Sequence, residues 1–295
     1  MPKLPVSRGL AAAILGLALT PAAAHAGWIF PEKGGSENAD KIWTLYLLIF
    51  ILATIVFIGV GGALVWAMVK FRARKGHVAA QIHGNTRLEI GWTVGAFVIL
   101  VFITVFTFIT LPGIKNPPAS DIDENGNPIA STKALYASTD QPPPPAGSPS
   151  LNLRVDGQQY VWRYQYPRSD KQVFSYVDMV VPVGITVTLD ITADDVAHSW
   201  WIPKLGGKMD ALPGYVNKTW FKIPLDAIGE GEQQVVYEGQ CAELCGRNHA
   251  NMLARVIGMR LPDYRAWVER KAAEIEQARE EAAETRRRIQ QEQGG

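Results

Sequence analysis

The sequence has almost no net charge and very few cysteines. Its 29 Lys and Arg residues offset 28 Asp and Glu residues, which leaves a formal net charge of +1 at pH 7. Nucleic-acid-binding proteins usually carry a basic excess, so the balance gives no support for such a partner. Only two cysteines are present, and there is no C-x-x-C-H motif to attach a c-type haem. A fused cytochrome c domain is therefore absent, and no internal repeat is visible.

The first 26 residues have the form of a secretory signal peptide. Lys3 and Arg8 give a positive start, Gly9–Thr20 is apolar and small, and AHA before Gly27 fits a cleavage site. A third membrane-spanning helix is the alternative. It is disfavoured because an apolar run of about 12 residues is shorter than the roughly 20 that cross a bilayer. We therefore predict a signal peptide over 1–26 and an exported N-terminus.

Two long apolar runs follow, and they predict a two-helix transmembrane hairpin over 36–111. The runs Ile42–Val69 and Ile90–Leu111 are uncharged, and each is long enough to cross a bilayer with some tilt. A buried core helix is the alternative, but a helix of this length in a soluble core would normally carry a polar stripe. The threonines in both runs can bond to backbone carbonyls of their own helix, so they do not argue against a lipid environment.

The connection between the two runs is basic, which predicts its side of the membrane. It sets one acid, Glu89, against Lys70, Arg72, Arg74, Lys75 and Arg87. The positive-inside rule places such a connection in the cytoplasm. We therefore predict a multi-pass protein of a bacterial-type plasma (inner) membrane. Both mature termini, and everything after Leu111, would lie on the extracytoplasmic side.

The composition changes twice after the hairpin. Residues 112–150 are rich in Pro, Gly, Ser, Asp and Asn, which predicts a Pro-rich extended linker with little material for a core. Residues 151–262 contain short β-rich runs broken by Pro and Gly, which predict an all-β sandwich or barrel. Residues 263–295 predict a long charged C-terminal helix. Arg279 and Arg286 stand where a coiled coil needs apolar side chains, which favours a solvated helix or one docked on a partner.

Both cysteines lie in one loop, CAELCGRNHANM, which runs from Cys241 to Met252. In an exported domain two nearby cysteines most often form a disulfide, and this interpretation stays open. The neighbouring residues favour a metal, because a turn that closes on itself can aim Cys245, His249 and Met252 at one point. Thiolate, imidazole and thioether are the ligands of copper electron-transfer sites, whereas zinc prefers four strong Cys and His donors.

A copper site of this kind needs another histidine, and His198 in DDVAHSWWIP is the candidate. It follows the β-rich run ITVTLDIT by six residues. A single His near Trp is more often packed or hydrogen-bonded than a ligand, but the loop shifts that balance. Two thiolates, two imidazoles, a thioether and the backbone carbonyl between the cysteines suit two copper ions bridged by both sulfurs.

The segments HSWWIPKLGGKMDALPGY and YEGQCAELCGRNHANM resemble the copper A domain of subunit II of haem-copper cytochrome c oxidases. That family has a cupredoxin-like β-barrel anchored by a two-helix hairpin, and the resemblance covers residues 36–262. It implies a dinuclear copper A centre with bridging thiolates, terminal imidazoles and weak axial ligands. These are, in that order, Cys241 and Cys245, His198 and His249, and Met252 with the backbone carbonyl of Glu243. The resemblance also implies that the Glu243 carboxylate faces a magnesium ion at the interface with the catalytic subunit.

The resemblance implies further roles outside the copper ligands. In the family an aromatic stretch receives the electron from cytochrome c, and GQQYVWRYQYP resembles it. Tyr160 takes the place of the usual Trp and Trp162 fits the next one, although an aromatic-rich strand is the alternative. Glu89 matches a family Glu at the cytoplasmic mouth of a proton pathway, but stabilisation by the helix dipole also explains an acid there. Candidates for docking a basic cytochrome are Asp178, Asp194, Asp195 and Asp210.

We therefore expect the subunit at which electrons enter a respiratory cytochrome c oxidase. It would take them from a c-type cytochrome and pass them to haem in catalytic subunit I, where oxygen is reduced to water with proton translocation. Quinol-oxidase subunit II shares the hairpin and barrel but lacks the copper ligands. Nitrous oxide reductase needs a large catalytic domain for which this chain has no room. A tethered binding module with a Cys241–Cys245 disulfide is the alternative from another class.

Overall fold

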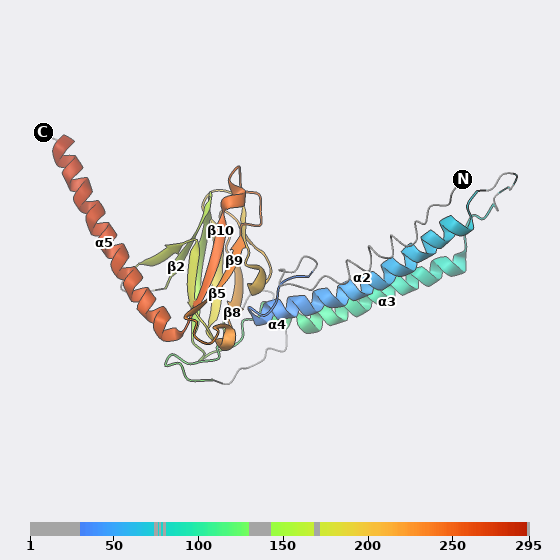
Figure 1. Ribbon diagram of the computed structural model, residues 1–295, viewed down its shortest axis with the longest axis horizontal. Helices are drawn as coiled ribbons and strands as arrows, with labels where there is room; N and C mark the ends of the chain where they lie inside the picture. Colours follow the sequence, from blue (N-terminus) through green and yellow to red (C-terminus); the bar gives the residue numbers. More distant parts are fainter. Residues whose placement is uncertain are drawn as a thin grey trace, which may run out of the picture. The chain divides into compact units, whose positions relative to one another are not determined.

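The computed structural model describes residues 30–73, 76, 78, 81–129, 143–167 and 172–293. The predicted signal peptide lies outside these residues, as do Arg74 and Lys75 of the basic connection. The described residues form two long helices, a short helix, ten strands and a long C-terminal helix, in that chain order (Figure 1). The predicted fold class is confirmed at this level.

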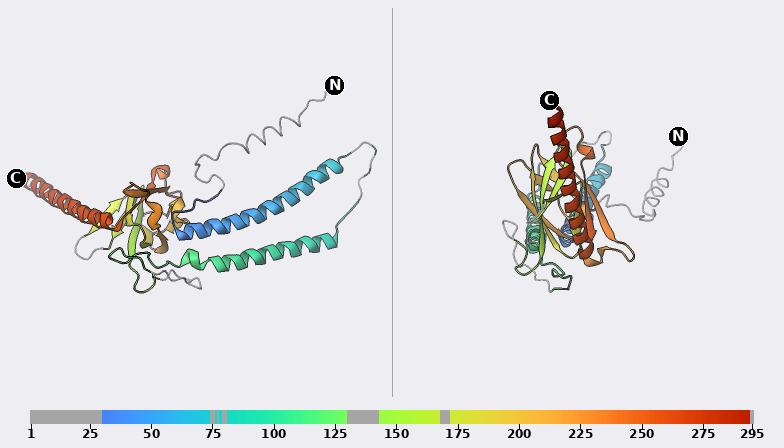
Figure 2. Two further views of the ribbon diagram at one scale, coloured as in Figure 1. Left: turned by 60° about the horizontal axis from the view of Figure 1, so that its bottom comes forward. Right: turned by 90° about the vertical axis from the view of Figure 1, so that its left-hand side faces the viewer.

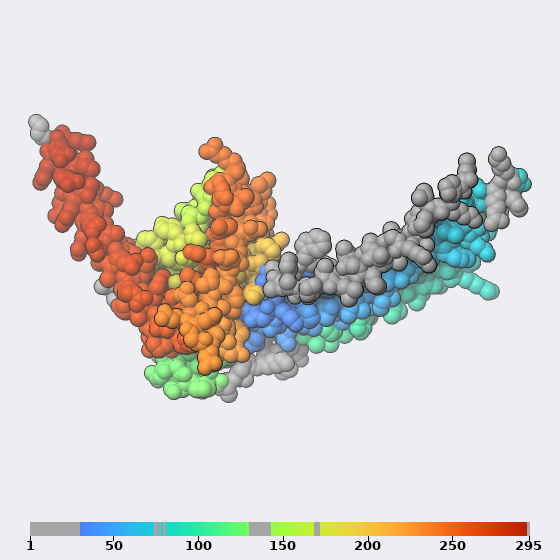
Figure 3. All heavy atoms as spheres, viewed as in Figure 1, coloured from blue at the N-terminus to red at the C-terminus, as the bar shows by residue number. Residues whose placement is uncertain are grey.

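Helices α2 (Glu37–Lys70) and α3 (Thr86–Thr110) are long and apolar enough to cross a membrane. The space-filling view shows α3 along the lower edge of α2 (Figure 3). As expected, six threonine hydroxyls in these helices donate to the backbone carbonyl four residues earlier. These are Thr44, Thr54, Thr93, Thr104, Thr107 and Thr110. Such bonds leave no hydroxyl group unsatisfied in an apolar environment.

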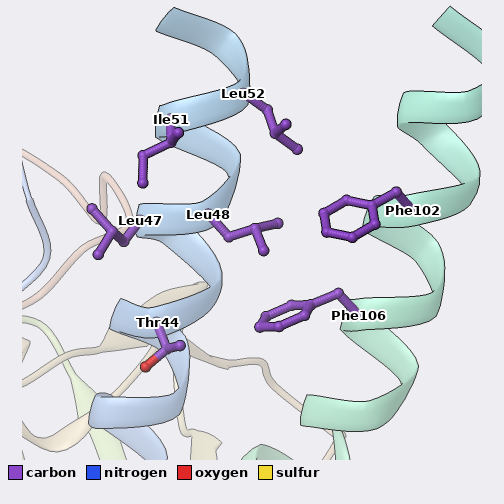
Figure 4. A pocket seen from close by; sticks show the side chains of 7 residues that line it. All are labelled: Thr44, Leu47, Leu48, Ile51, Leu52, Phe102 and Phe106. Atoms are coloured by element: carbon purple, nitrogen blue, oxygen red, sulfur yellow. The ribbon is translucent and has the colours of Figure 1, made fainter. Parts of the chain in front are cut away.

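The two helices do not fill the space between them. An apolar cavity of about 380 Å³ lies along α2 and α3. Phe102 and Phe106 of α3 point toward Leu48 of α2 across this space (Figure 4). The hairpin therefore presents an apolar groove as well as apolar outer faces.

Two sheets face each other across the core of the β domain (Figure 2). The five-stranded sheet has the order β3-β2-β1-β5-β8 and the three-stranded sheet the order β4-β10-β9. A two-stranded sheet pairs β6 with β7. The strands are β1 (Ser150–Gln158), β2 (Val161–Tyr166), β3 (Val173–Tyr176), β4 (Asp178–Pro182), β5 (Thr186–Ala193), β6 (His198–Trp200), β7 (Met209–Ala211), β8 (Asn217–Lys222), β9 (Gln234–Gln240) and β10 (Leu253–Met259).

The sequence pattern explains which strand faces form the core. Side chains alternate across a strand, and in β2 this alternation buries Trp162, Tyr164 and Tyr166. Strand β5 pairs with β1 on one side and β8 on the other, and seven of its eight residues are buried. Leu189 of β5 and Val256 of β10 belong to one apolar cluster, so the two sheets share a single core.

The C-terminal helix α5 (Leu261–Gln293) docks on its own β domain through its first half. Ala272 and Ile275 are buried, and the Trp267 ring lies 5.1 Å from the ring of Tyr166, measured between centroids. Residues 277–293 are exposed. The first half of α5 is thus docked on the barrel, and the second half is a solvated helix.

Part of the predicted linker is docked on the barrel, which the composition did not indicate. A short helix, α4 (Pro112–Lys115), follows α3. The Ser120 hydroxyl donates to the Pro149 carbonyl at 2.6 Å and accepts from the Thr186 backbone N–H at 2.8 Å. Asp121 N–H donates to the Gly184 carbonyl at 2.7 Å. These bonds satisfy backbone groups at the start of β5, which explains why a polar segment packs here.

A buried lysine at the end of β8 joins the start of the hairpin to the barrel. Lys222 is 3% exposed, and its Nζ lies 2.9 Å from a carboxylate oxygen of Glu37 and 2.7 Å from one of Asp121. It also donates to the Ala119 carbonyl at 3.2 Å. Its backbone N–H donates to the Ser36 hydroxyl at 3.0 Å. We call these contacts the Lys222 clamp.

Replacing Lys222 with Met is expected to lower the free energy of unfolding by about 2 kcal/mol, because hydrogen bonds to charged groups contribute about 1.5–3 kcal/mol. Burial lowers the pKa of Lys222, but its bonds to Asp121 and Glu37 outweigh this and raise the pKa above the ordinary 10.5. The clamp is therefore fully present below pH 10.5, and its contribution falls as the pH rises through the raised pKa.

Thermal unfolding of the full chain in detergent, at neutral and high pH, measures this effect. The matched control is Lys218→Met in the same strand, because the Lys218 side chain is 55% exposed and lies 3.9 Å from Asp190. It should change stability by no more than about 0.5 kcal/mol. Equal losses in the two variants would contradict the clamp.

Candidate metal centre

Backbone pairing brings the loop Cys241–Met252 to the strand that carries His198. Strands β9 and β10 are antiparallel neighbours with Gln240 opposite Leu253, so the loop begins and ends at one place. Cys241 N–H donates to the Met252 carbonyl at 2.9 Å and closes the loop. Ala242 N–H donates to the Ser199 carbonyl of β6 at 2.8 Å. The residue next to His198 is thus bonded to the residue next to Cys241.

All six predicted copper donors converge. The two Sγ atoms are 4.0 Å apart, about twice the length of a disulfide bond, and both cysteines are free. The Cys241 Sγ lies 3.9 Å from His198 Nδ1 and 3.3 Å from the Glu243 carbonyl oxygen. The Cys245 Sγ lies 3.6 Å from His249 Nδ1 and 3.8 Å from Met252 Sδ. The sequence interpretation named these six donors from their residue types and spacing and from the resemblance to the copper A domain.

Most of the donors are shielded from solvent. His198, Cys241, Cys245 and Met252 are buried, with exposed fractions between 0% and 4%. The Glu243 side chain is exposed, although its carbonyl faces Cys241. The centre is therefore dry on the sulfur side, while one carboxylate remains available at the surface.

The two thiols have opposite pKa shifts. Burial raises the pKa of Cys241, but hydrogen bonds from His198 and from backbone groups outweigh it and lower this pKa to about 6. Burial and the nearby Cys241 charge raise the pKa of Cys245 to about 11. Without a cation, the second thiol therefore resists deprotonation once the first is ionised. A metal ion would favour the second deprotonation, so the donor set fits a soft cation with thiolate ligands.

Asp195 orients the His198 ring. Its Oδ1 lies 2.8 Å from His198 Nε2, which leaves Nδ1 facing Cys241. Burial lowers the pKa of His198, but the bonds to Cys241 and Asp195 outweigh it and raise this pKa. The sequence interpretation took Asp195 only as a docking acid and missed this contact. An acid three residues before a candidate ligand histidine was the available signal.

The other predicted site residues lie in different surroundings. Tyr160 is in the β1–β2 turn, against the donor loop: a Cβ built at Gly246 would lie 2.6 Å from its hydroxyl oxygen. Trp162 is fully buried, with its ring centroid 5.8 Å from that of His198. Glu89 is in the first turn of α3, where its carboxylate accepts from the Asn85 N–H at 3.2 Å. A carboxylate that accepts from a backbone N–H at the start of a helix stabilises the helix N-terminus, which is a structural role for Glu89.

Three of the acids considered for docking a cytochrome already have partners in the chain, and Asp195 has been described above with His198. Asp178 makes a two-point ion pair with Arg255, at 2.7 and 2.9 Å. Asp194 accepts from the Gln158 side chain at 2.6 Å beside the donor-bearing turn. Pairing with Arg255 reduces the attraction that Asp178 can exert on a basic partner.

Comparison with known proteins identifies the family. Residues 174–258 match the family model described as "Cytochrome C oxidase subunit II, periplasmic domain", and residues 23–110 match its "transmembrane domain" counterpart. A "Probable cytochrome c oxidase subunit 2" of Rickettsia bellii is 30% identical over 256 residues, which cover 80% of this chain and 81% of the relative. The chain belongs to the cytochrome c oxidase subunit II family.

Other family members are also similar to this chain. The "Cytochrome c oxidase subunit 2" of Alkalihalophilus pseudofirmus is 32% identical over 254 residues, and the chain spans 65% of that relative's length. The crystal structure of the periplasmic domain of subunit II of cytochrome oxidase (CoxB) of Bradyrhizobium japonicum is 29% identical. It covers 42% of this chain and 94% of that chain, with a TM-score of 0.37. Residues 174–258 of the β domain thus correspond to the family's periplasmic domain, for which the sequence resemblance implies a copper centre.

Gly246 allows the donor loop to pack against the β1–β2 turn, so Gly246→Ala should be destabilising. Its φ is +135°, and the added Cβ would lie 2.6 Å from the Tyr160 hydroxyl and 2.9 Å from Gln159 Nε2. Overpacking of this kind costs about 1–3 kcal/mol. Thermal unfolding of the metal-free chain measures the loss.

The control is Gly231→Ala, which also has a positive φ, of +82°, but no atom within 4 Å of the added Cβ. It carries backbone strain without the clash. If the two variants unfolded at the same temperature, close packing at Gly246 would not hold the loop.

Proposed function

We propose that this chain is the subunit at which electrons enter a respiratory cytochrome c oxidase. It would accept them one at a time from a c-type cytochrome and pass them to haem in the catalytic subunit, which reduces oxygen to water with proton translocation. The observation that carries this proposal is the convergence of six donors from two separate segments. Family membership supports it independently.

The donor set fits a dinuclear copper centre. Cys241, Cys245, His198 and His249 would hold the copper ions through sulfur and imidazole nitrogen. Met252 and the Glu243 carbonyl would be weaker donors. When bound, copper ions held in this way supply one-electron transfer with small changes in bond length, which is fast at small driving force.

The protein's own residues prepare this site by burial and fixed geometry. The fully buried His198 and Met252 exclude water from the sulfur side. The closed loop holds Cys241 against Met252 through a backbone bond of 2.9 Å. Asp195 fixes the ring of His198, and such partners of ligand residues tune both affinity and electronic properties.

Three further roles are part of the proposal. Tyr160 is proposed as the residue through which electrons arrive, because it lies against the donor loop at the edge of the centre, whereas Trp162 is buried behind His198. The exposed Glu243 side chain is proposed to bind magnesium at the interface with the catalytic subunit. Glu89 is proposed to lie at the mouth of a proton pathway, in addition to its capping bond.

The proposed orientation places the copper domain outside the cytoplasm. The basic residues of the α2–α3 connection favour a cytoplasmic location for that connection, as the positive-inside rule requires. Two membrane-capable helices and bacterial relatives fit a plasma-membrane protein. A soluble c-type cytochrome would then reach the centre from the extracytoplasmic side.

Copper loading of the full chain in detergent tests the centre. We expect two copper ions per chain and a mixed-valence electron paramagnetic resonance signal shared by two equivalent nuclei. Cys241→Ser and Cys245→Ser should each abolish that signal, because each removes a bridging sulfur. Ala242→Ser, which lies between them and removes no donor, should retain it.

Thiol titration distinguishes the disulfide-stapled binding module. Anaerobically purified, metal-free protein should show two reactive thiols that become protected on copper loading. No free thiols and no copper uptake would instead support the binding module.

Electron arrival at Tyr160 is tested by stopped-flow reduction of the copper-loaded chain with a reduced c-type cytochrome. Tyr160→Leu should slow reduction about tenfold, equivalent to about 1.4 kcal/mol, while copper content stays unchanged. The control Tyr176→Leu removes a tyrosine that is 49% exposed on β3, and it should reduce at the original rate. Equal rates for wild type and Tyr160→Leu would remove Tyr160 from the path.

A further inference from the structure

The turn between β1 and β2 contacts both segments that carry metal donors. Gln159 occupies this turn, and its side-chain Nε2 donates to the carbonyl of Cys245 at 2.6 Å. This bond joins residues 86 positions apart in the sequence. It holds the second cysteine of the loop, whereas the Ala242–Ser199 bond holds the first cysteine's neighbour.

The same residue reaches the histidine segment through its backbone. Gln159 N–H donates to Asp195 Oδ2 at 2.7 Å, and Asp195 Oδ1 lies 2.8 Å from His198 Nε2. Asp195 also accepts from the Val196 N–H at 2.6 Å, which fixes its carboxylate in the turn. A continuous chain of hydrogen bonds therefore runs from Cys245 through Gln159 and Asp195 to His198.

Gly246 of the donor loop packs closely against the side chain of Gln159. A Cβ at Gly246 would lie 2.9 Å from Gln159 Nε2, so the loop backbone lies directly against the amide group. The side chain of Gln159 is thus confined by the loop that it holds.

We propose that Gln159 is a positioning residue that sets the separation between the Cys245 side of the donor loop and His198. The inference rests on the proposed copper function, and it concerns a residue that touches no metal donor atom. A centre that shares an electron between two metals requires fixed donor positions. Loss of the Gln159 amide would free the Cys245 half of the loop from the histidine half. Mutation of a residue that hydrogen-bonds to the metal ligands typically lowers metal affinity 10- to 100-fold.

Three full-chain variants test the proposal. Gln159→Leu removes the amide, and Gln159→Glu keeps the side-chain length but replaces the donor with an acceptor that faces the Cys245 carbonyl. The matched control is Gln158→Leu, because Gln158 Nε2 makes a bond of the same 2.6 Å length to Asp194, outside the donor set. The three are compared for copper loss to an excess of chelator, reduction potential and metal-free amide hydrogen exchange.

We expect both Gln159 variants to lose copper about tenfold faster than wild type and to have a shifted reduction potential. In metal-free protein, amides of residues 245–251 should exchange faster in both, while Gln158→Leu stays like wild type in every measurement. A wild-type potential and copper retention in Gln159→Leu would overturn the proposal. Wild-type behaviour of Gln159→Glu alone would overturn it too, because packing rather than the donated bond would then suffice.

The outcomes separate this inference from the proposed function. If the wild-type chain binds no copper, the proposed function fails, and the exchange experiment on metal-free protein still tests the role of Gln159. If wild type binds copper and the Gln159 variants match it, the positioning role fails while the copper centre stands.

Discussion

A small group of backbone hydrogen bonds joins the donor loop to strand β6 and the residue after it. The candidate metal centre depends on these bonds. Gln240 N–H donates to the Trp201 carbonyl at 3.1 Å and Ala242 N–H to the Ser199 carbonyl at 2.8 Å. These bonds fix β6 and the residue after it beside Cys241. Because they use backbone groups, they position the donors and occupy no side chain that could bind a metal. The donor side chains remain free for chemistry.

The electrostatics of the sulfur pair explain why such a site favours a metal. Two buried thiols 4.0 Å apart cannot both ionise without a compensating charge, and the pKa values shift in opposite directions, to about 6 for Cys241 and about 11 for Cys245. A bound cation removes that conflict, since it stabilises both thiolates together. The His198 imidazole, whose Nε2 is held by Asp195, keeps its Nδ1 facing the sulfur of Cys241.

Sequence reasoning worked where the chemistry of a residue decides its role. The apolar runs predicted two helices, and the structure begins them at Glu37 and Thr86. The candidate copper donors could be named because few residue types bind copper and because their spacing resembles that of the copper A domain. Contacts that depend on tertiary pairing could not be predicted. Composition described Ser120 as linker, although it bonds to β5, and nothing in the sequence shows that Gln159 meets Cys245 across 86 positions. Lys222 is a similar case, since a buried lysine is recognisable only from its carboxylate partners.

Strand β5 connects the anchoring of the chain to its chemistry. Thr186 at the start of β5 lies opposite Lys222, and at the other end Ala193 is followed by the turn that contains Asp195 and then by β6, which begins at His198. Eight residues of strand span roughly 25 Å. Because β5 is bonded on both sides, to β1 and β8, it cannot bend independently of the sheet. The Lys222 clamp, which attaches the hairpin to β8, is therefore connected through a packed sheet to the segment that contains Asp195 and His198. Under the proposed function, this continuity would hold the copper centre at a fixed distance from the membrane-embedded partner.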